Sequence, residues 1–240
     1  MPILIFRRSL VPLAAFAIGC SNPSQERDRA EPMAGNEPTR FPVVEDNLHH
    51  DTLLIQTTFD LGNGSFIMVA QNVQETFEGL RLYHYRFEAD SAVNMLAISS
   101  PAYDSWTMLP SFFRTDSSRG GPIWVLANFG ERESWGQKVM LFDGDFKDAG
   151  FMDVALPERM MEDDTMRLKR RDISARIRYT ARNDTAYFRF ACDSVYLYDD
   201  QADRYDIVVP ARSVHYTFHP VTGFELWVDG QRRTKAPEGT

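Results

Sequence analysis

The sequence predicts an all-β fold, an antiparallel β-sandwich of jelly-roll-like type with one or two short helices. Short runs of β-branched and aromatic residues recur at roughly 8 to 12 residue spacing and end at Gly, Asn, Asp or Pro. Long amphipathic helical patterns are missing. Many short strands joined by turns are typical of antiparallel sandwiches and barrels. The runs are TLLIQTTF, SFIMVAQ, LRLYHYRF, PIWVLANF, QKVMLF, ARIRYTA, TAYFRFAC, SVYLY, YDIVV, SVHYTF and FELWV.

These runs lie within residues 41–233, which we expect to form one β-sandwich domain, because a segment of this size can build a single core. A short helix is expected near Val73 to Phe77. Residues 234–240 are expected to be a disordered tail.

The first residues have the features of an export signal. Arg7 and Arg8 precede an apolar run from Leu10 to Gly19, and small residues end that run. A charged segment, an apolar segment and a small-residue cleavage site are typical of a signal peptide. The run is shorter than the roughly 20 residues of a transmembrane helix. Residues 1–19 are therefore predicted to be a signal peptide.

The residues Ala17-Ile18-Gly19-Cys20 resemble the lipobox of bacterial lipoprotein precursors, although Ala17 stands where that family most often has Leu. The resemblance implies that the Cys20 thiol is acylated and that Cys20 becomes the first residue of the mature chain. Ser21 resembles the outer-membrane sorting pattern of Gram-negative cells. The alternatives are an ordinary secretory signal in which Cys20 is incidental, a cytosolic chain with a frayed apolar N-terminus, and a twin-arginine export signal at Arg7-Arg8.

Residues 20–40 are predicted to be the lipidated cysteine and a flexible linker, because the segment is rich in Pro, Gly, Ser and charge and has little to bury. With Cys20 acylated, Cys192 has no disulfide partner, and we expect it to be a small buried apolar residue. Removing Arg7 and Arg8 leaves 24 of the 26 basic residues against 34 acidic ones, a net charge of about −10. Nucleic acid is therefore not an expected partner.

The run ARIRYTARNDTAYFRFAC predicts a hairpin with a two-residue turn at Asn183-Asp184. Its register pairs Ile177 with Phe190, Tyr179 with Phe188, and Ala175 with Cys192, which makes one face apolar. The other face carries Arg176, Arg178, Arg182, Tyr187 and Arg189, with Arg178 opposite Arg189. Like charges opposite each other are destabilising, so acidic groups from neighbouring strands or from the loop PERMMEDD are expected nearby. The alternative is that this face binds an anionic ligand, such as an acidic glycan or a phosphate-bearing lipid.

The run SVHYTFHPVTGFELWVDG predicts a second hairpin, with a three-residue loop Val221-Thr222-Gly223 and Gly223 in the left-handed region. This register pairs Phe218 with Leu226 and Tyr216 with Val228. It places His219 opposite Glu225, Thr217 beside Trp227, and His215 opposite Asp229. A carboxylate beside an imidazole favours its protonated form. The face is expected to be either a solvated edge or a weak pH-sensitive or sugar-stacking surface.

The run FELWVDG resembles a strand of concanavalin-like and laminin-G-type jelly rolls, in which a similar Tyr-Val-Asp-Gly run recurs. The resemblance covers seven residues and implies a sandwich architecture, and no ligand residue is carried over from it.

The familiar hydrolase, nucleotide and zinc motifs are missing from the sequence, so no cofactor and no metal is expected. His215 and His219 are too far apart along a strand to share one ion. The acidic residues of FDGDFKDAGF do not have the spacing of an EF-hand loop. The acidic residues of YDDQADRYD are most simply surface-turn residues, with irregular calcium binding as the alternative. Glu131 and Glu133 beside Trp135 are either two glycosidase carboxylates or part of a tight turn.

Together these observations predict a membrane-anchored extracytoplasmic lipoprotein of the cell envelope, on the outer membrane if the cell is Gram-negative. We expect a non-catalytic binding or structural role, with a glycan or an envelope protein as the partner. The alternative is a carbohydrate-binding module or a glycoside hydrolase. The candidate ligand-binding residues are Trp227, His215, Asp229, Arg178, Arg189 and Tyr187, and the lipid-attachment residue is Cys20.

Overall fold

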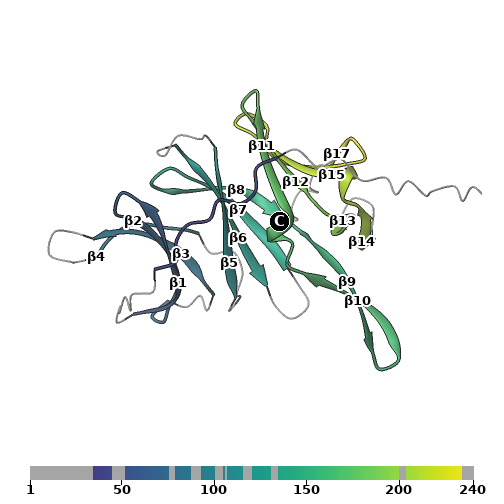
Figure 1. Cartoon of the computed structure of the whole chain (residues 1–240), viewed down its shortest axis with the longest axis horizontal. Coiled ribbons are helices and arrows are strands. Elements are labelled where there is room, and N and C mark those ends of the chain that lie inside the picture. Colours follow the sequence, from purple (N-terminus) through teal and green to yellow (C-terminus); the bar gives the residue numbers. More distant parts are fainter. Residues whose placement is uncertain are drawn as a thin grey trace, which may run out of the picture. The chain divides into compact units, whose positions relative to one another are not determined.

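The computed structural model (Figure 1) describes residues 35–44, 52–75, 79–87, 93–100, 105, 107–115, 121–130, 135–199 and 204–233. The chain divides into two units, Met1–Glu31 and Pro32–Thr240, and every described residue belongs to the second. The regular elements of these residues are antiparallel strands and two short 3-10 turns. The predicted all-β, sandwich-like fold class is therefore confirmed.

Two of the four sheets are simple meanders, in which strands that follow each other in the chain are hydrogen-bonded neighbours (Figure 1). This arrangement needs only short hairpin connections. The first meander consists of β1 (Leu53–Gly62), β2 (Ser65–Asn72), β3 (Arg81–Phe87) and β4 (Val93–Ile98), and the second consists of β5 (Met108–Arg114), β6 (Ile123–Gly130), β7 (Trp135–Phe142) and β8 (Phe146–Met152).

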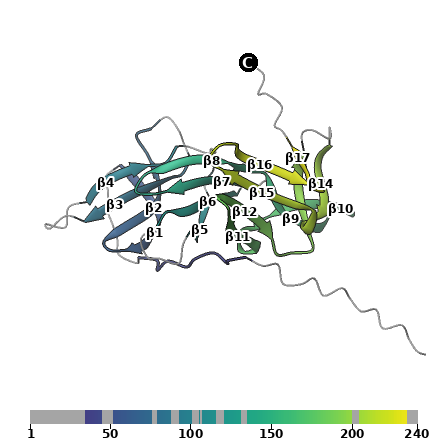
Figure 2. The same ribbon diagram turned by 90° about the horizontal axis from the view of Figure 1, so that it is seen from above.

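The other two sheets share the rest of the chain, and Figure 2 shows β11, β12, β15 and β16 side by side. One sheet has the order β10-β9-β13-β14 and the other has the order β11-β12-β15-β16-β17. Their strands are β9 (Val154–Glu162), β10 (Thr165–Arg171), β11 (Ile177–Arg182), β12 (Thr185–Phe190), β13 (Ser194–Asp199), β14 (Arg204–Pro210), β15 (Val214–His219), β16 (Gly223–Val228) and β17 (Gln231–Arg233), with η1 (Ser174–Arg176) before β11 and η3 (Ala211–Ser213) before β15.

Strand β6 of the β5–β8 sheet is buried on both faces. All eight residues of β6 are buried, and they alternate between two hydrophobic clusters. Trp124 and Leu126 pack with residues of β9, β11, β12, β13 and β15, whereas Val125 and Ala127 pack with residues of β2 and β3. Successive side chains of a strand point to opposite faces, so a strand with two buried faces is apolar throughout. This explains the continuous apolar run PIWVLANF.

Two-residue turns with positive φ at both residues connect several of the hairpins. They are Asn63-Gly64, Asp163-Asp164, Asn183-Asp184 and Asp229-Gly230, with φ values between 49° and 74°. Such turns match the right-handed twist of the strands, and Asn, Asp and Gly tolerate the left-handed region best. The predicted turn at Asn183-Asp184 is confirmed.

The β11–β12 register also agrees with the prediction over most of its length. Ile177 pairs with Phe190 and Tyr179 with Phe188. The predicted pair of Ala175 with Cys192 is wrong, because Ala175 belongs to η1 and the ladder ends at Ile177 and Phe190.

Cys192 nevertheless has the expected apolar surroundings. It is half-buried and packs against the cluster that contains Phe190. Burial raises the pKa of its thiol to about 11.

The predicted register of the β15–β16 hairpin is wrong by two residues. Phe218 pairs with Phe224 and Tyr216 with Leu226. The predicted register placed Pro220 inside the ladder, where proline cannot donate a hydrogen bond. In the structure Pro220 lies in the three-residue loop 220–222.

Gly223 begins β16 opposite His219 and has the expected left-handed conformation, with a φ of 80°. Because the displacement is an even number of residues, each side chain keeps its predicted face but has a different partner. His215 lies opposite Trp227, and Thr217 lies opposite Glu225.

Residues 35–44 run along the sheets in extended conformation. Asn36 forms a bridge to Tyr179 of β11, and Thr39 forms a bridge to Phe112 of β5. The Asn36 N–H donates to the Tyr179 carbonyl over 2.7 Å. Residues 35–40 were expected to belong to the flexible linker. Because Asn36 and Thr39 pair with strands, the folded body begins earlier in the chain than predicted. The described residues do not include residues 1–34, which contain the predicted signal peptide and the rest of the predicted linker. They also do not include the predicted tail, residues 234–240.

The helix expected near residues 73–77 is not seen in its described part, where Val73 and Gln74 form a turn. Thr76 and Phe77 lie outside the described residues.

Three glycines of the β5–β8 sheet are each covered by an aromatic ring. A Cβ added to Gly130 would collide with the Trp135 ring, one added to Gly136 with the Phe151 ring, and one added to Gly150 with Phe224. An aromatic ring over a glycine replaces the packing that the missing side chain cannot supply. This accounts for the Gly- and aromatic-rich segment around Trp135, which the sequence alone did not explain.

Candidate functional site

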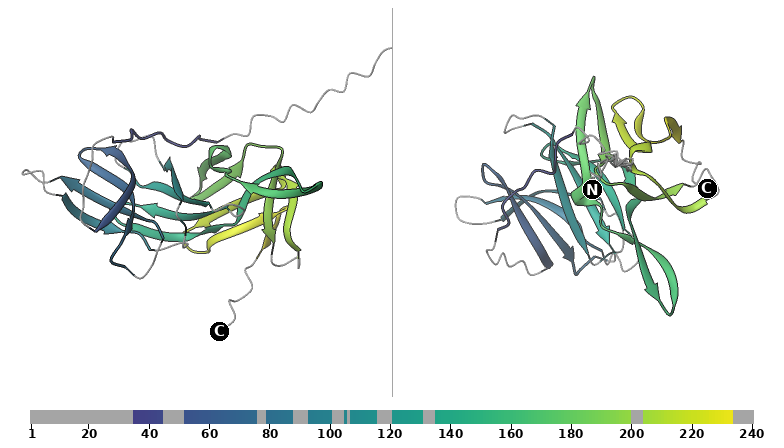
Figure 3. Two further views of the ribbon diagram at one scale, coloured as in Figure 1. Left: turned by 90° about the horizontal axis from the view of Figure 1, so that it is seen from below. Right: turned by 45° about the vertical axis from the view of Figure 1, so that its right-hand side comes forward.

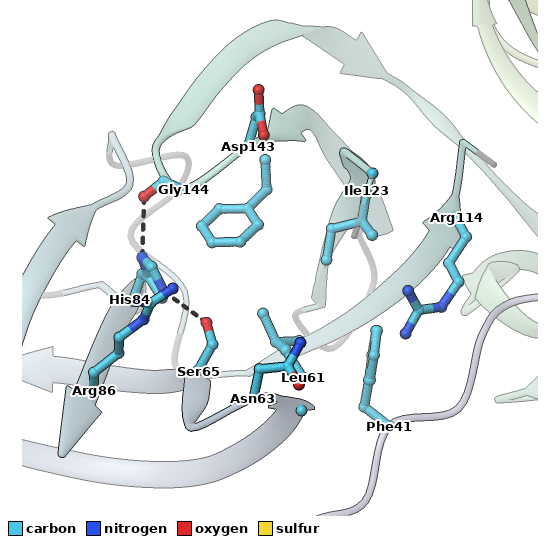
Figure 4. Close-up of a pocket in the computed structure, with 13 residues that line it drawn as sticks. Phe41, Leu61, Asn63, Ser65, His84, Arg86, Arg114, Ile123, Asp143 and Gly144 are labelled. Atoms are coloured by element: carbon cyan, nitrogen blue, oxygen red, sulfur yellow. Dashed lines mark hydrogen bonds between the residues drawn. The ribbon is translucent and has the colours of Figure 1, made fainter. Parts of the chain in front are cut away.

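A cavity of about 310 Å³ opens between the β1–β4 and β5–β8 sheets (Figure 4). Its polar wall comes from the β1–β2 turn, β3 and the β7–β8 turn. Its apolar wall includes Phe41, Leu61, Ile123 and Phe142. The volume is at the lower end of the range of small-molecule sites, about 300–1,000 Å³.

The polar wall is built around His84 and Ser65. Both nitrogens of the His84 ring are hydrogen-bonded: Nδ1 lies 3.0 Å from the Gly144 carbonyl oxygen, and Nε2 lies 2.8 Å from Ser65 Oγ. A carbonyl oxygen only accepts, so Nδ1 carries the proton and donates to Gly144, and the Ser65 hydroxyl donates to Nε2. These bonds connect β2 and β3 to the β7–β8 turn.

The surroundings of His84 favour its neutral form. The side chain is buried, and its ring packs edge-on against Phe142 with 4.8 Å between the centroids. Burial lowers the pKa of His84, Arg86 lowers it further, and the bond to Gly144 opposes them. A neutral imidazole keeps a lone pair on Nε2 for Ser65. The same contact lets an imidazole activate a serine hydroxyl.

Arg86 and Arg114 supply the positive charge of the cavity. Figure 4 shows their side chains on different sides of it, Arg86 beside His84 and Arg114 above Phe41. The Arg114 guanidinium carbon lies 5.2 Å from the centroid of the Phe41 ring. Among the described residues, no carboxylate lies within ion-pair distance of either guanidinium, although Asp143 also lines the cavity. A cavity that has two guanidinium groups and an apolar wall is suited to an anion that carries an apolar group.

Most of the predicted surface residues lie on one face of the β11–β17 sheet. Arg178 lies opposite Arg189. His215 lies opposite Trp227, with the two rings parallel within 6° and their centroids 5.9 Å apart. The centroid of the Tyr187 ring lies 6.3 Å from the centroid of the His215 ring. Asp229 does not join this group, because it forms the β16–β17 turn.

The expected protonation of His215 is wrong. Asp229 is not its cross-strand partner, and the pKa of His215 is lowered, first by burial and then by Arg189. The face therefore carries a neutral imidazole.

The acidic partner of the arginine face is not the expected loop. Glu37 accepts from Arg178 over 3.1 Å. The acidic residues Glu158 and Glu162 of the segment PERMMEDD instead pair with β10, where Glu158 binds Arg171 and Glu162 binds Arg167.

Other predicted residues lie outside the described part of the chain or have a different role. Glu131, Glu133 and Cys20 lie outside the described residues. Trp135 covers Gly130. Within the described part of the chain, no three His, Cys, Asp or Glu side chains come together in a group able to hold a metal ion, and no helix has the length and apolar character needed to span a bilayer.

The cavity was not predicted from the sequence. The only local signal is His84, a polar residue within the apolar strand LRLYHYRF. Its partners Ser65 and Gly144 are distant in the sequence.

Comparison of the chain with protein-family models, with curated proteins and with solved structures gave no match.

Proposed function

We propose that this protein is a lipid-anchored, extracytoplasmic binding protein of the cell envelope, whose cavity holds a small anionic molecule with an apolar part. The observation that carries this proposal is the presence of Arg86 and Arg114 at a cavity with an apolar wall. Guanidinium groups form strong charge-assisted hydrogen bonds with carboxylate, sulfonate and phosphate groups. The role is binding, with the membrane as partner through the lipid.

The proposed location rests on the sequence features of the N-terminus. Arg7 and Arg8 precede the apolar run, and Cys20 follows the lipobox-like residues 17–19. A chain anchored by two or more acyl chains remains on its membrane, because each buried methylene contributes about 0.8 kcal/mol. If the cell is Gram-negative, the proposed membrane is its outer membrane.

The ligand proposal is tested with two fluorescent probes that differ in charge. Anilinonaphthalene sulfonate carries an aromatic group and an anion, and N-phenylnaphthylamine carries the aromatic group without the anion. We expect Arg86→Gln and Arg114→Gln each to weaken sulfonate binding about tenfold or more, the effect of losing a hydrogen bond to a charged group. Binding of the neutral probe should change little.

The matched control is Arg212→Gln, because Arg212 is exposed in η3, outside the cavity. It should leave the affinity for both probes unchanged. Equal affinity of the two cavity variants and the parent protein for the sulfonate would contradict the proposed site.

The anchor is tested by mass spectrometry of the protein isolated from a cell that produces it. The expected product begins at Cys20 and carries acyl chains, and Cys20→Ser should leave the membrane fraction. An unmodified N-terminus, or unchanged membrane association of the variant, would contradict lipidation.

A further inference from the structure

The outer face of the β11–β17 sheet carries a row of three aromatic rings. Tyr187 of β12, His215 of β15 and Trp227 of β16 are consecutive in this row, with centroid separations of 6.3 Å and 5.9 Å. We call these three residues and Arg189 the aromatic platform. It belongs to a different sheet from the cavity, whose lining includes none of its residues. Figure 2 shows the strands that carry it side by side.

The rings are held against the sheet. The indole Nε1–H of Trp227 donates to Thr217 Oγ1 over 3.0 Å, and Thr217 itself is buried. The His215 ring is parallel to the indole within 6°. All three rings are half-buried. The indole is therefore fixed in place, with the imidazole stacked parallel to it.

The exposed part of a fixed aromatic ring suits the apolar face of a sugar ring. The face of an aromatic ring is electron-rich, and the C–H groups of a pyranose are weakly positive, so the two attract each other in addition to excluding water. Because all three rings are half-buried, they offer less apolar surface to a bilayer than the aromatic residues of an interfacial amphipathic helix.

Arg189 gives the platform its charge. Its guanidinium lies 5.0 Å from the centroid of the Tyr187 ring and donates one hydrogen bond, to Thr180 Oγ1 over 3.3 Å. Within the described residues no carboxylate forms an ion pair with Arg189. The arginines nearby are already paired, Arg178 with Glu37 and Arg232 with Glu225. Arg189 therefore retains donors for an external anion, and its fork matches a carboxylate.

We infer that the aromatic platform binds an acidic polysaccharide, with sugar rings stacked on Trp227 and His215 and a sugar carboxylate on Arg189. Tyr187, two residues before Arg189 in β12, holds the Arg189 guanidinium over its ring. This inference does not depend on the cavity or on its ligand.

The test uses the full chain and two polymers, polygalacturonate and its methyl ester, which share a sugar backbone and differ in charge. Affinity is measured by titration calorimetry. We expect the parent protein to prefer polygalacturonate. Arg189→Gln should lower the affinity for polygalacturonate about tenfold, the loss typical of a charge-assisted bond, and should leave binding of the ester unchanged. Trp227→Ala should weaken binding of both polymers.

Two control variants show whether the loss of binding is specific to the platform. Arg159→Gln changes an exposed arginine of β9, which belongs to another sheet, and should not alter binding. Arg114→Gln changes the cavity and should not alter polysaccharide binding, so failure of one proposal does not imply failure of the other. The thermal unfolding midpoint of Trp227→Ala is measured alongside, and Arg189→Gln provides the test that does not depend on removing a half-buried ring.

The inference is overturned if the parent protein binds neither polymer, or if Arg189→Gln and the parent bind polygalacturonate equally. It is also overturned if the face binds phosphatidylglycerol vesicles in an Arg189-dependent manner and ignores both polymers. That result would identify a membrane as the partner.

Discussion

Replacing Gly136 by alanine tests how the β5–β8 sheet accommodates its aromatic residues. Gly136 is buried in β7, and the Phe151 ring of β8 lies across it. A Cβ at this position would lie 2.9 Å from Cε1 of Phe151 and closer still to Cζ, whereas ordinary contacts begin at 3.4 Å. The Phe151 ring must therefore shift away from Gly136.

Two effects of opposite sign contribute to the free energy of unfolding. Forcing extra atoms into a packed site costs about 1–3 kcal/mol. Alanine in place of glycine within a strand is otherwise favourable by roughly 0.5–1 kcal/mol, because the unfolded chain loses freedom. With Phe151 present, the collision dominates and Gly136→Ala should be destabilising. For a body of this size, the melting temperature should fall by about 2–4 °C for each kcal/mol lost.

The sign should reverse when the ring is removed. In a Phe151→Ala background the three atoms that lie nearest to the added Cβ are gone, so the same Gly136→Ala substitution should increase the free energy of unfolding by roughly 0.5–1 kcal/mol. Urea unfolding of the parent, both single variants and the double variant, followed by tryptophan fluorescence, gives all four values. An equal effect of Gly136→Ala in both backgrounds would refute the proposed packing, since additivity means that the two positions do not interact.

Three further predictions concern single groups. Because burial lowers the pKa of His84, the unfolded chain binds a proton at this imidazole more readily than the folded protein does, so the free energy of unfolding should fall as the pH drops below about 6.5. Urea titrations at several pH values should show a shallower decline for His84→Gln than for the parent protein. An equal decline in the two proteins would count against this prediction. In the Cys20→Ser variant, the raised pKa of Cys192 should make native alkylation at pH 8 at least about 20-fold slower than in denaturant, and equal rates measured by mass spectrometry would show an accessible thiolate. Asp184→Val should lower the free energy of unfolding in urea by about 1–2 kcal/mol, because a β-branched residue is strained at a φ of 60°. The control Arg182→Val, at an exposed position, should change this free energy by less than about 0.5 kcal/mol. Similar losses of stability in the two variants would argue against the positive-φ turn.

The two hairpins show where sequence patterns were sufficient and where they were not. In β11–β12, Asn183-Asp184 is a two-residue turn and both strands alternate, so one register satisfies the turn and the apolar face together. In β15–β16, two registers that differ by an even displacement give the same faces. The choice between them depended on Pro220, whose missing N–H favours a loop position.

The cavity could not be predicted because its parts are far apart in the chain. Ser65 and His84 meet through the pairing of β2 with β3, which places Ser65 opposite Arg86 and Ile67 opposite His84. Gly144 comes from another sheet. Periodicity within a strand specifies which residues face inward, but it does not specify which sheets face each other.

The edge strand β10 affects how copies of this protein would meet if they carry the proposed lipid anchor. β10 lies at the end of its sheet, and Figure 3 shows the β9–β10 hairpin continuing as a two-stranded ribbon. Its sequence TMRLKRR places Arg167, Lys169 and Arg171 along this edge. Charged side chains on an edge discourage strand addition by another chain. On the proposed membrane, where tethered neighbours meet repeatedly in two dimensions, this charged border would let copies crowd together and still stay separate.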